Sequence, residues 1–249
     1  MDNLLWIAMS GAKESFNGLA VRSNNLANSN TTGFKADFEQ ARAMPEFADA
    51  YPTRAFAMTE RPGYNMQGGA MQTTQRALDV AIQGDGFLAV TDSEGNEAYT
   101  RFGSLRLDSD NVLRTNTGLD VRDVDGNQII LPALVEDLNI GKDGVISGRP
   151  QGADLNVLEN YQRIKLVKPE DYKEIEKGYD GLFRRTDGTE IAQDNTVKIQ
   201  NGMLEASNVN PVEELTSLIR LERQYDAQMK LIKTADEMDQ AQNRLMTFE

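Results

Sequence analysis

Histidine and cysteine, the residues that most often carry enzyme chemistry, are absent from this 249-residue chain. The sequence therefore offers no thiol nucleophile, imidazole base or disulfide, and no Cys or His metal ligand. Any catalysis would rest on carboxylates, lysine, tyrosine or serine. The chain has 39 Asp and Glu against 26 Lys and Arg, a formal net charge of −13. This charge makes nucleic acid and anionic membranes poor partners.

Two short motifs could belong to ligand-binding loops. Residues 84–87, Gly-Asp-Gly-Phe, look like the opening of a dinucleotide-binding fingerprint, but residues 87–90 are strand-like. A pyrophosphate needs a helix N-terminus at that point. Residues 123–127 carry the Asp-x-Asp-x-Asn alternation of a calcium loop, yet the glycine and the terminal glutamate of such a loop are out of register. Both motifs are interpreted as tight turns between strands.

Adjacent carboxylates could act as a general acid and base. The candidates are Glu213 with Glu214, and Asp236 with Glu237 and Asp239. A general acid needs a raised pKa in a desolvated pocket, whereas these residues fall on the polar face of an expected helix. They are interpreted as solvated surface. The residues alone thus assign no catalytic, metal or cofactor-binding role and require no cofactor.

Helix breakers are unevenly distributed along the chain. All seven prolines lie between Pro45 and Pro211, and no glycine follows Gly202. Both ends are therefore free to form long helices.

The N-terminal segment has the spacing of a helix over about residues 3–28. Asp2 is placed to cap its start, and residues 28–33 end it with turn formers and Gly33. Its apolar seam advances in alternating steps of four and three, as in a heptad repeat. The seam consists of Leu5, Met9, Ala12, Phe16, Leu19, Ser23 and Leu26.

The C-terminal segment predicts a second long helix. Asn210 is expected to cap it, with Pro211 at the first helical position and Glu213 favourable to the helix dipole. Apolar residues recur every three or four positions from Leu215 to Leu245, so the two terminal helices are expected to pair as a coiled-coil-like domain. Packing of helix on helix is favoured over lipid binding because residues 1–33 carry no net charge. The residues expected to form the seams and the assembly interface are Leu5, Met9, Phe16, Leu19, Leu26, Leu215, Leu218, Tyr225, Met229 and Ile232.

Between the helices the apolar period changes to two. Residues 105–108 alternate apolar and charged side chains, and Asp-Gly and Asn-containing turns recur along the segment. This pattern predicts short strands in an all-β domain. The fold class is thus α+β: an N-terminal helix (1–33), an extended loop segment (34–75), a β-rich outer domain (76–206) and a C-terminal helix (207–249).

Several motifs carry a family likeness. Two segments near the N-terminus resemble the N-terminal signature of the bacterial flagellar rod and hook proteins: residues 24–28, Asn-Asn-Leu-Ala-Asn, and residues 32–35, Thr-Gly-Phe-Lys. The C-terminal signature of the same family is similar to residues 202–211 and the following helix, which contains Tyr225. Motifs in the middle of the chain, such as residues 99–103, Tyr-Thr-Arg-Phe-Gly, resemble the central block of the same family. The likeness covers nearly the whole chain and is greatest to proximal-rod members, with the distal rod protein as the alternative. The signature residues are Asn24, Asn25, Leu26, Ala27, Asn28, Gly33, Phe34, Glu205, Ser207, Asn208 and Asn210.

The resemblance implies a structural subunit of the basal-body rod, the shaft that transmits motor torque across the periplasm to the hook and filament. It further implies that the protein is not an enzyme, that it is exported by the flagellar type III apparatus, and that its partners are other axial proteins and copies of the chain itself. Nucleic acid is not expected as a partner because of the net charge of −13, and membrane insertion is not expected because no apolar run approaches the ~20 residues of a spanning helix. Two rivals come from other classes: a carboxylate-based cell-wall hydrolase, motivated only by acidic composition, and a ligand-binding β module on a helical stalk.

Overall fold

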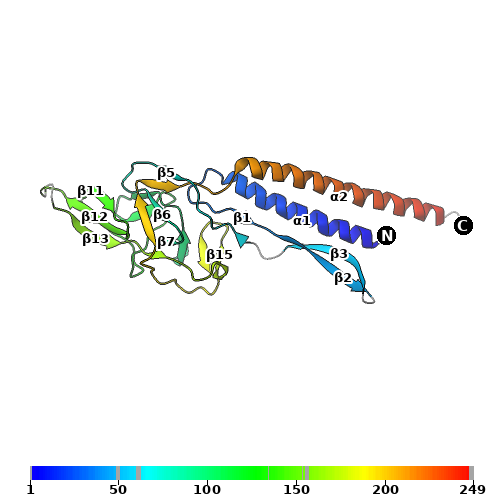
Figure 1. Cartoon of the computed structure of the whole chain (residues 1–249), viewed down its shortest axis with the longest axis horizontal. Helices are drawn as coiled ribbons and strands as arrows, with labels where there is room; N and C mark the ends of the chain where they lie inside the picture. The colour runs from blue at the N-terminus through cyan, green and yellow to red at the C-terminus, as the bar shows by residue number, and fades with distance from the viewer. Residues whose placement is uncertain are drawn as a thin grey trace. The chain divides into compact units, whose positions relative to one another are not determined.

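The computed structural model describes residues 2–48, 51–59, 63–133, 135–152, 154 and 157–246. Two helices at the chain ends flank a middle region that is mostly β, which confirms an α+β fold (Figure 1). The chain divides into two compact units. The helical unit comprises residues 1–29, 35–65 and 209–249, and the β unit comprises residues 30–34 and 66–208. The last three residues of the expected C-terminal segment, 247–249, lie outside the described part.

The helical unit is built on α1 (Asp2–Ala27) and α2 (Pro211–Met246), which lie side by side (Figure 1). The expected cap of α2 is confirmed: the side-chain oxygen of Asn210 accepts a hydrogen bond of 3.2 Å from the backbone N–H of Val212. Pro211 occupies the first helical position, where its missing N–H costs nothing.

Strands also belong to the helical unit. β1 (Asp37–Phe38) pairs with β4 (Gly63–Tyr64), and β2 (Ala41–Ala48) pairs with β3 (Tyr51–Thr59) in a long antiparallel hairpin. β3 packs against α1. The sequence predicts that residues 34–75 are extended and loop-like, because no apolar period runs through them. The hairpin forms without such a period, since β2 and β3 satisfy each other's backbone groups.

The β unit contains short antiparallel strands. A five-stranded sheet has the order β14-β7-β8-β16-β15, a three-stranded sheet has the order β11-β12-β13, and three further pairs are β9–β10, β6–β17 and β5–β18. The strands are β5 (Met71–Thr73), β6 (Val80–Gln83), β7 (Phe87–Thr91), β8 (Glu97–Thr100), β9 (Leu105–Leu107), β10 (Leu113–Thr115), β11 (Val135–Ile140), β12 (Val145–Pro150), β13 (Glu159–Arg163), β14 (Leu166–Val167), β15 (Ile175–Lys177), β16 (Phe183–Arg185), β17 (Lys198–Asn201) and β18 (Met203–Glu205), with a single 3₁₀ turn at Tyr172–Glu174.

The hydrophobic core of the β unit is made almost entirely of branched aliphatic side chains. Its main cluster consists of Val80, Ile82, Leu88, Leu105, Leu113, Val121, Ile129, Leu131, Ile140, Ile146, Ile164, Leu166, Val197 and Ile199. Such residues suit pleated surfaces that are buried on one face. Burial of this cluster supplies the hydrophobic stabilisation of the unit.

Both suspected ligand loops are turns, as expected. Residues 84–87 connect the end of β6 to the start of β7 without a helix. In residues 123–127 the N–H of Gly126 donates to the carbonyl of Asp123 at 2.8 Å, and the N–H of Asp123 donates to the carbonyl of Asn127. The carboxylate of Asp123 accepts from the backbone N–H of Arg163. These hydrogen bonds show that Asp123 belongs to the turn and holds it against the neighbouring strand β13.

Candidate assembly surfaces of the helical unit

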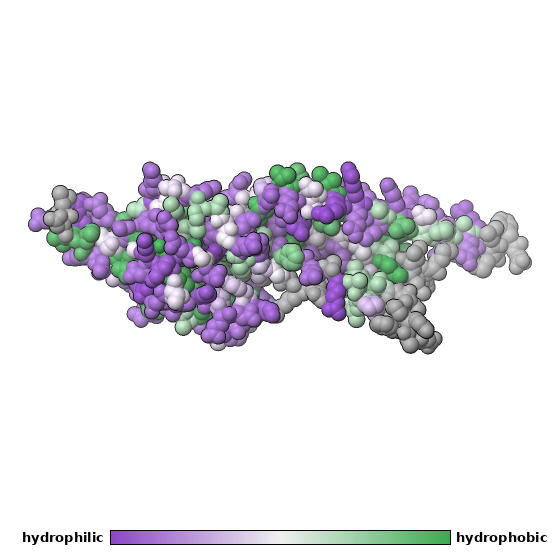
Figure 2. Space-filling view, viewed as in Figure 1, coloured by the Kyte–Doolittle hydropathy of each residue, from purple (hydrophilic) through white to green (hydrophobic). Residues whose placement is uncertain are grey.

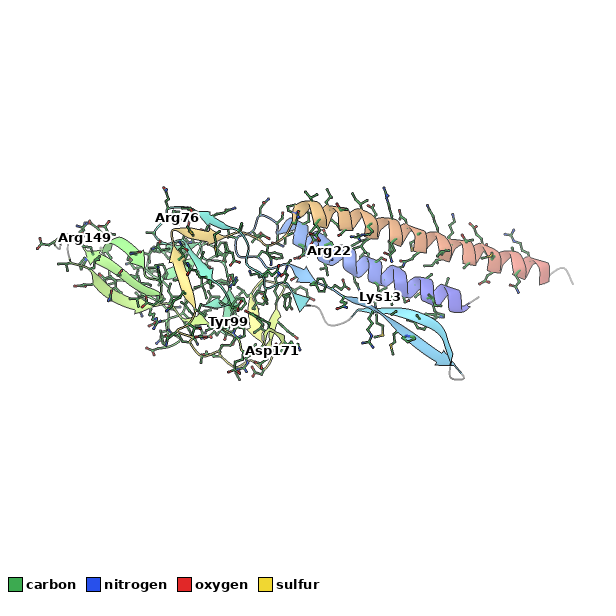
Figure 3. All side chains as sticks on the ribbon, viewed as in Figure 1. Lys13, Arg22, Arg76, Tyr99, Arg149 and Asp171 are labelled. Atoms are coloured by element: carbon green, nitrogen blue, oxygen red, sulfur yellow. The ribbon has the colours of Figure 1, made fainter. Side chains whose placement is uncertain are left out.

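Polar side chains hold α1 against α2 at two levels. Arg22, near the C-terminal end of α1, forms an ion pair of 3.0 Å with Glu214 in the first turn of α2 (Figure 3). Farther along, the hydroxyl of Ser15 donates to the side-chain oxygen of Gln228 at 3.2 Å. Later residues of α1 thus meet earlier residues of α2, so the helices run antiparallel.

Asn25 ties three elements of this unit together. Its side-chain amide donates to the backbone carbonyl of Asp37 at 2.9 Å and to Glu214 at 3.3 Å, and its oxygen accepts from the N–H of Asp37. The side chain is fully buried. A buried asparagine with specific partners fixes the register of paired helices. From the sequence Asn25 is recognisable only as a signature residue, because its partner Glu214 is distant along the chain.

Small residues line the face of α1 that meets α2. Ala8, Ala12 and Ser15 are buried. A Cβ atom added to Gly11 would come within 2.5 Å of the side chain of Gln228, and one added to Gly18 within 3.2 Å of Leu221. The two helices therefore approach each other closely where these small residues lie.

The large apolar residues expected in the seams divide into two groups. Leu5, Leu19, Leu26, Leu218, Tyr225 and Ile232 are half-buried. Met9, Phe16, Leu215 and Met229 are exposed, and Phe16 has 62% of its surface accessible although its ring lies 6.5 Å from that of Tyr225. Leu5, Met229 and Ile232 do come together, on an open groove bordered by Asp226, Lys230, Lys233 and Asp236.

Seven of the eight side chains of α1 that the structure describes as exposed form a regular row, which we call the outer row; the eighth is Asn24. The outer row advances in steps of three and four and contains one charge, Lys13 (Figure 3). Its members are Trp6, Met9, Lys13, Phe16, Ala20, Ser23 and Ala27. A helix face bordered by solvent is normally polar. This spacing is that of a heptad seam, so the outer row has the pattern of a second helix-packing face.

The surface of α2 also carries exposed apolar side chains. Val212, Leu215 and Ile219 follow one another at helical spacing in its first turns, and hydrophobic surface is visible there (Figure 2). Leu231 and Met238, seven residues apart, are exposed on its C-terminal half. Sequence reasoning passed over Trp6, Val212 and Leu231 because it assigned a single seam to each helix.

Within the β unit, the two terminal signatures meet. The N–H of Gly33 donates to the carbonyl of Glu205 at 2.7 Å, and the N–H of Asn208 donates to the carbonyl of Phe34. The ammonium group of Lys177 lies 3.7 Å from the centre of the Phe34 ring, a cation–π contact. Asn208 also donates from its side chain to the carbonyl of Gln67. The conformation after α1 is thus fixed by residues near the other end of the chain.

The remaining signature residues lie in or beside the helical ends. Asn24, Asn25, Leu26 and Ala27 occupy the last turn of α1. The side-chain amide of Asn28 donates to the backbone carbonyl of Asn24 at 2.9 Å, which satisfies a carbonyl at the helix terminus. Ser207 is half-buried in the segment that leads from β18 toward α2.

Comparisons with known proteins give three family matches. Residues 5–35 match the model described as "Flagella basal body rod protein", residues 81–148 match "Flagellar hook protein FlgE/F/G D1 domain", and residues 200–245 match "Flagellar basal body rod FlgEFG protein C-terminal". The flagellar basal-body rod protein FlgF of Escherichia coli (strain K12) is 37% identical over the full length of both chains. The chain belongs to the flagellar basal-body rod protein family.

Other rod proteins agree with this assignment. FlgF of Caulobacter vibrioides is 35% identical, covering 97% of this chain and 96% of the relative. FlgG of Buchnera aphidicola subsp. Acyrthosiphon pisum is 32% identical, covering 97% and 98%. The chain is a structural subunit of the flagellar basal-body rod. Two of the three family matches fall on the segments that contain the outer row and the first turns of α2.

The hydrolase alternative gains no support from these relatives, which are structural rod proteins. In this rod subunit the buried carboxylate of Glu97 is paired with Lys165 at 2.7 Å and with Arg122 at 3.3 Å. Tyr99, inside the β unit (Figure 3), donates to Glu97, and burial raises the pKa of its hydroxyl. Glu97 is thus held in place by a lysine, an arginine and a tyrosine inside the β unit.

Among the described helices, none has the length and apolar character needed to cross a membrane.

Proposed function

We propose that this rod subunit assembles through the outward-facing apolar side chains of its two helices. The outer row of α1 is the observation that carries the proposal, because Trp6 and Phe16 are each about three-fifths exposed beside a single lysine. Contact with a neighbouring subunit would remove this surface from water at roughly 25 cal/mol per Å². The small and polar side chains between α1 and α2 set the orientation of the two helices, and the outer row packs against neighbouring subunits.

The partners in this proposal are copies of the chain and other axial proteins of the rod, arranged head to tail so that the contacts propagate helically. The α1–α2 pair then becomes part of a larger coiled-coil-like tube, with residues 76–206 as its outer domain. We assign the subunit to the proximal rod, in keeping with its likeness to FlgF relatives. Export through the flagellar type III apparatus, without membrane insertion, is part of the same proposal. Assembly requires no catalytic step or cofactor.

The test is a substitution in the outer row. Phe16→Asp should prevent incorporation into basal bodies and abolish swimming of cells that lack the natural subunit, because a carboxylate would be buried in the contact. Tyr179→Asp is the matched control, since Tyr179 is a fully exposed aromatic residue of the β unit. Isolated basal bodies are analysed for the subunit by mass spectrometry, and circular dichroism verifies that each variant folds. Normal incorporation of Phe16→Asp would refute the proposal.

A further inference from the structure

Methionine has an unusual distribution in this protein. Six of the eight methionines whose side chains the structure describes are more than 40% exposed, whereas methionine is normally among the more buried residue types. Among the described residues, neither hydrophobic core cluster of the β unit contains a methionine. The exposed methionines are Met9, Met44, Met58, Met71, Met229 and Met238.

Five of these six lie in the helical unit. Met9 belongs to the outer row of α1, Met229 lines the groove beside Leu5, and Met238 lies on α2 seven residues after Leu231. Met44 and Met58 are on the β2–β3 hairpin. Flexible thioether side chains are common on surfaces that pack against several partners. The same side chains are accessible to solvent in the unassembled subunit.

Exposed thioethers are the principal targets of two-electron oxidants here, because the chain has no thiol. A methionine sulfur attacks one oxygen of a peroxide and the O–O bond breaks. An S–O bond forms, the sulfur loses two electrons, and the peroxide is reduced to water after proton transfer. The product, methionine sulfoxide, is polar and chiral, and it disrupts methionine-rich contacts.

From these observations we infer that Met9, Met229 and Met238 are an oxidation-sensitive modification site that controls assembly. Peroxides convert them to sulfoxides in the unassembled subunit, and the modified subunit no longer packs against its neighbours. Assembly covers the three sulfur atoms and protects them. The inference rests on the proposed function, because it assigns these side chains to the subunit contact.

Protection is measured on the full chain. Purified subunit and isolated basal bodies are treated with hydrogen peroxide, and peptide mass spectrometry follows sulfoxide formation at each methionine. Met9, Met229 and Met238 should oxidise about tenfold more slowly in basal bodies than in the free subunit, as expected for thioethers that lose solvent access. Equal rates in the two samples would overturn the inference.

The effect of modification is measured with paired variants. Glutamine at all three positions approximates the polar sulfoxide and should markedly lower incorporation, whereas leucine at all three should incorporate normally and remain competent after peroxide treatment. Met71→Gln, at an exposed position of the β unit, is the control and should incorporate normally. If the triple glutamine variant incorporates normally while Phe16→Asp does not, the oxidation inference fails and the proposed function stands. If Phe16→Asp also incorporates normally, both fail.

Discussion

Arg101 and Glu205 form a two-pronged ion pair inside the β unit, with nitrogen–oxygen distances of 3.1 and 3.0 Å, although 104 positions separate them in the chain. Both side chains are almost completely buried. Arg101 also donates to the backbone carbonyls of Gly86 and Gly84, and the N–H of Gly69 donates to Glu205. The pair joins the end of β8 to the end of β18 and also binds three backbone groups, the carbonyls of Gly84 and Gly86 and the N–H of Gly69.

Removal of one partner from this pair should be strongly destabilising. Glu205→Ala leaves the guanidinium of Arg101 buried without its carboxylate, and breaking such a pair costs about 3–5 kcal/mol. Urea unfolding of the purified chain gives the free energy of unfolding. Glu136→Ala is the control, because Glu136 is half-exposed in its ion pair with Arg149 and should change the free energy by less than about 1 kcal/mol. A similar loss in both variants would contradict the role given to the buried pair.

Gly33 should not tolerate a side chain. Its φ is +69°, and an added Cβ would lie 2.4 Å from the backbone carbonyl of Arg101. Gly33→Val therefore combines a left-handed backbone with a backbone clash and should abolish motility. Gly126→Ala is the comparison: its φ is +81°, and an added Cβ would meet only the end of the Arg122 side chain at 3.9 Å. That variant should lose about 1 kcal/mol of unfolding free energy and swim normally.

Asn24 and Asn25 offer a matched pair for testing how the helices are registered. Asn25→Ala removes the buried side chain that bonds both the N–H and the carbonyl of Asp37, and loss of such hydrogen bonds costs about 1–3 kcal/mol. Asn24→Ala alters an exposed side chain and should change stability by less than about 0.5 kcal/mol. Thermal unfolding followed by circular dichroism at a helix-sensitive wavelength distinguishes them. Equal melting temperatures would show that Asn25 does not hold the helical unit together.

Asp180 should contribute stability at neutral pH and lose that contribution in acid. Hydrogen bonds from Arg184 hold the pKa of this carboxyl below its ordinary value of 3.8. Because the native pKa is lower than the unfolded one, the stabilisation is fully present above 3.8 and disappears as pH falls through the native pKa. Asp180→Asn should therefore be less stable than the natural chain at pH 7, with the difference closing in acid.

A double-mutant cycle isolates this effect. In an Arg184→Gln background, Asp180→Asn should have little effect on the free energy of unfolding at pH 7, because the partner of the carboxylate is gone. Arg184 also pairs with the buried Asp92 at 2.9 Å, so Arg184→Gln alone should be more destabilising than Asp180→Asn. An undiminished effect of Asp180→Asn in that background would assign its stabilisation to another contact.

Local rules predicted the parts of the fold that depend on neighbouring residues. The start of α2 follows from Asn210 and Pro211, and the turn at residues 123–127 follows from its Asp, Gly and Asn content. The ion pair of Arg101 with Glu205 could not be derived in the same way, because charge pairing across 104 residues depends on the complete fold. The motifs that contain both residues were nevertheless recognisable.

The heptad pattern was ambiguous for a different physical reason. It identifies apolar stripes but does not say which partner covers each stripe. In α1 the small residues Ala8, Ala12 and Ser15 face α2, while the larger Met9 and Phe16 remain exposed. A helix that packs on more than one side shows overlapping apolar repeats. Hydrophobicity alone then assigns the larger side chains to the contact between α1 and α2, although small residues form it.

The unassembled subunit should therefore be unevenly stable. The α1–α2 contact buries small and polar groups such as Ala12 and Ser15, whereas the β unit buries a cluster of Val, Ile and Leu side chains. Local opening costs least where few apolar contacts are lost, and helices of this length are marginal without packing on their apolar faces. Amides of residues 3–28 should exchange with deuterium at least about tenfold faster than those of β7 and β8 in a verified monomer. In assembled rods their exchange should slow, because neighbouring subunits cover the outer row. Equal protection of α1 and the β core in the monomer would mean that the helices are complete without their neighbours.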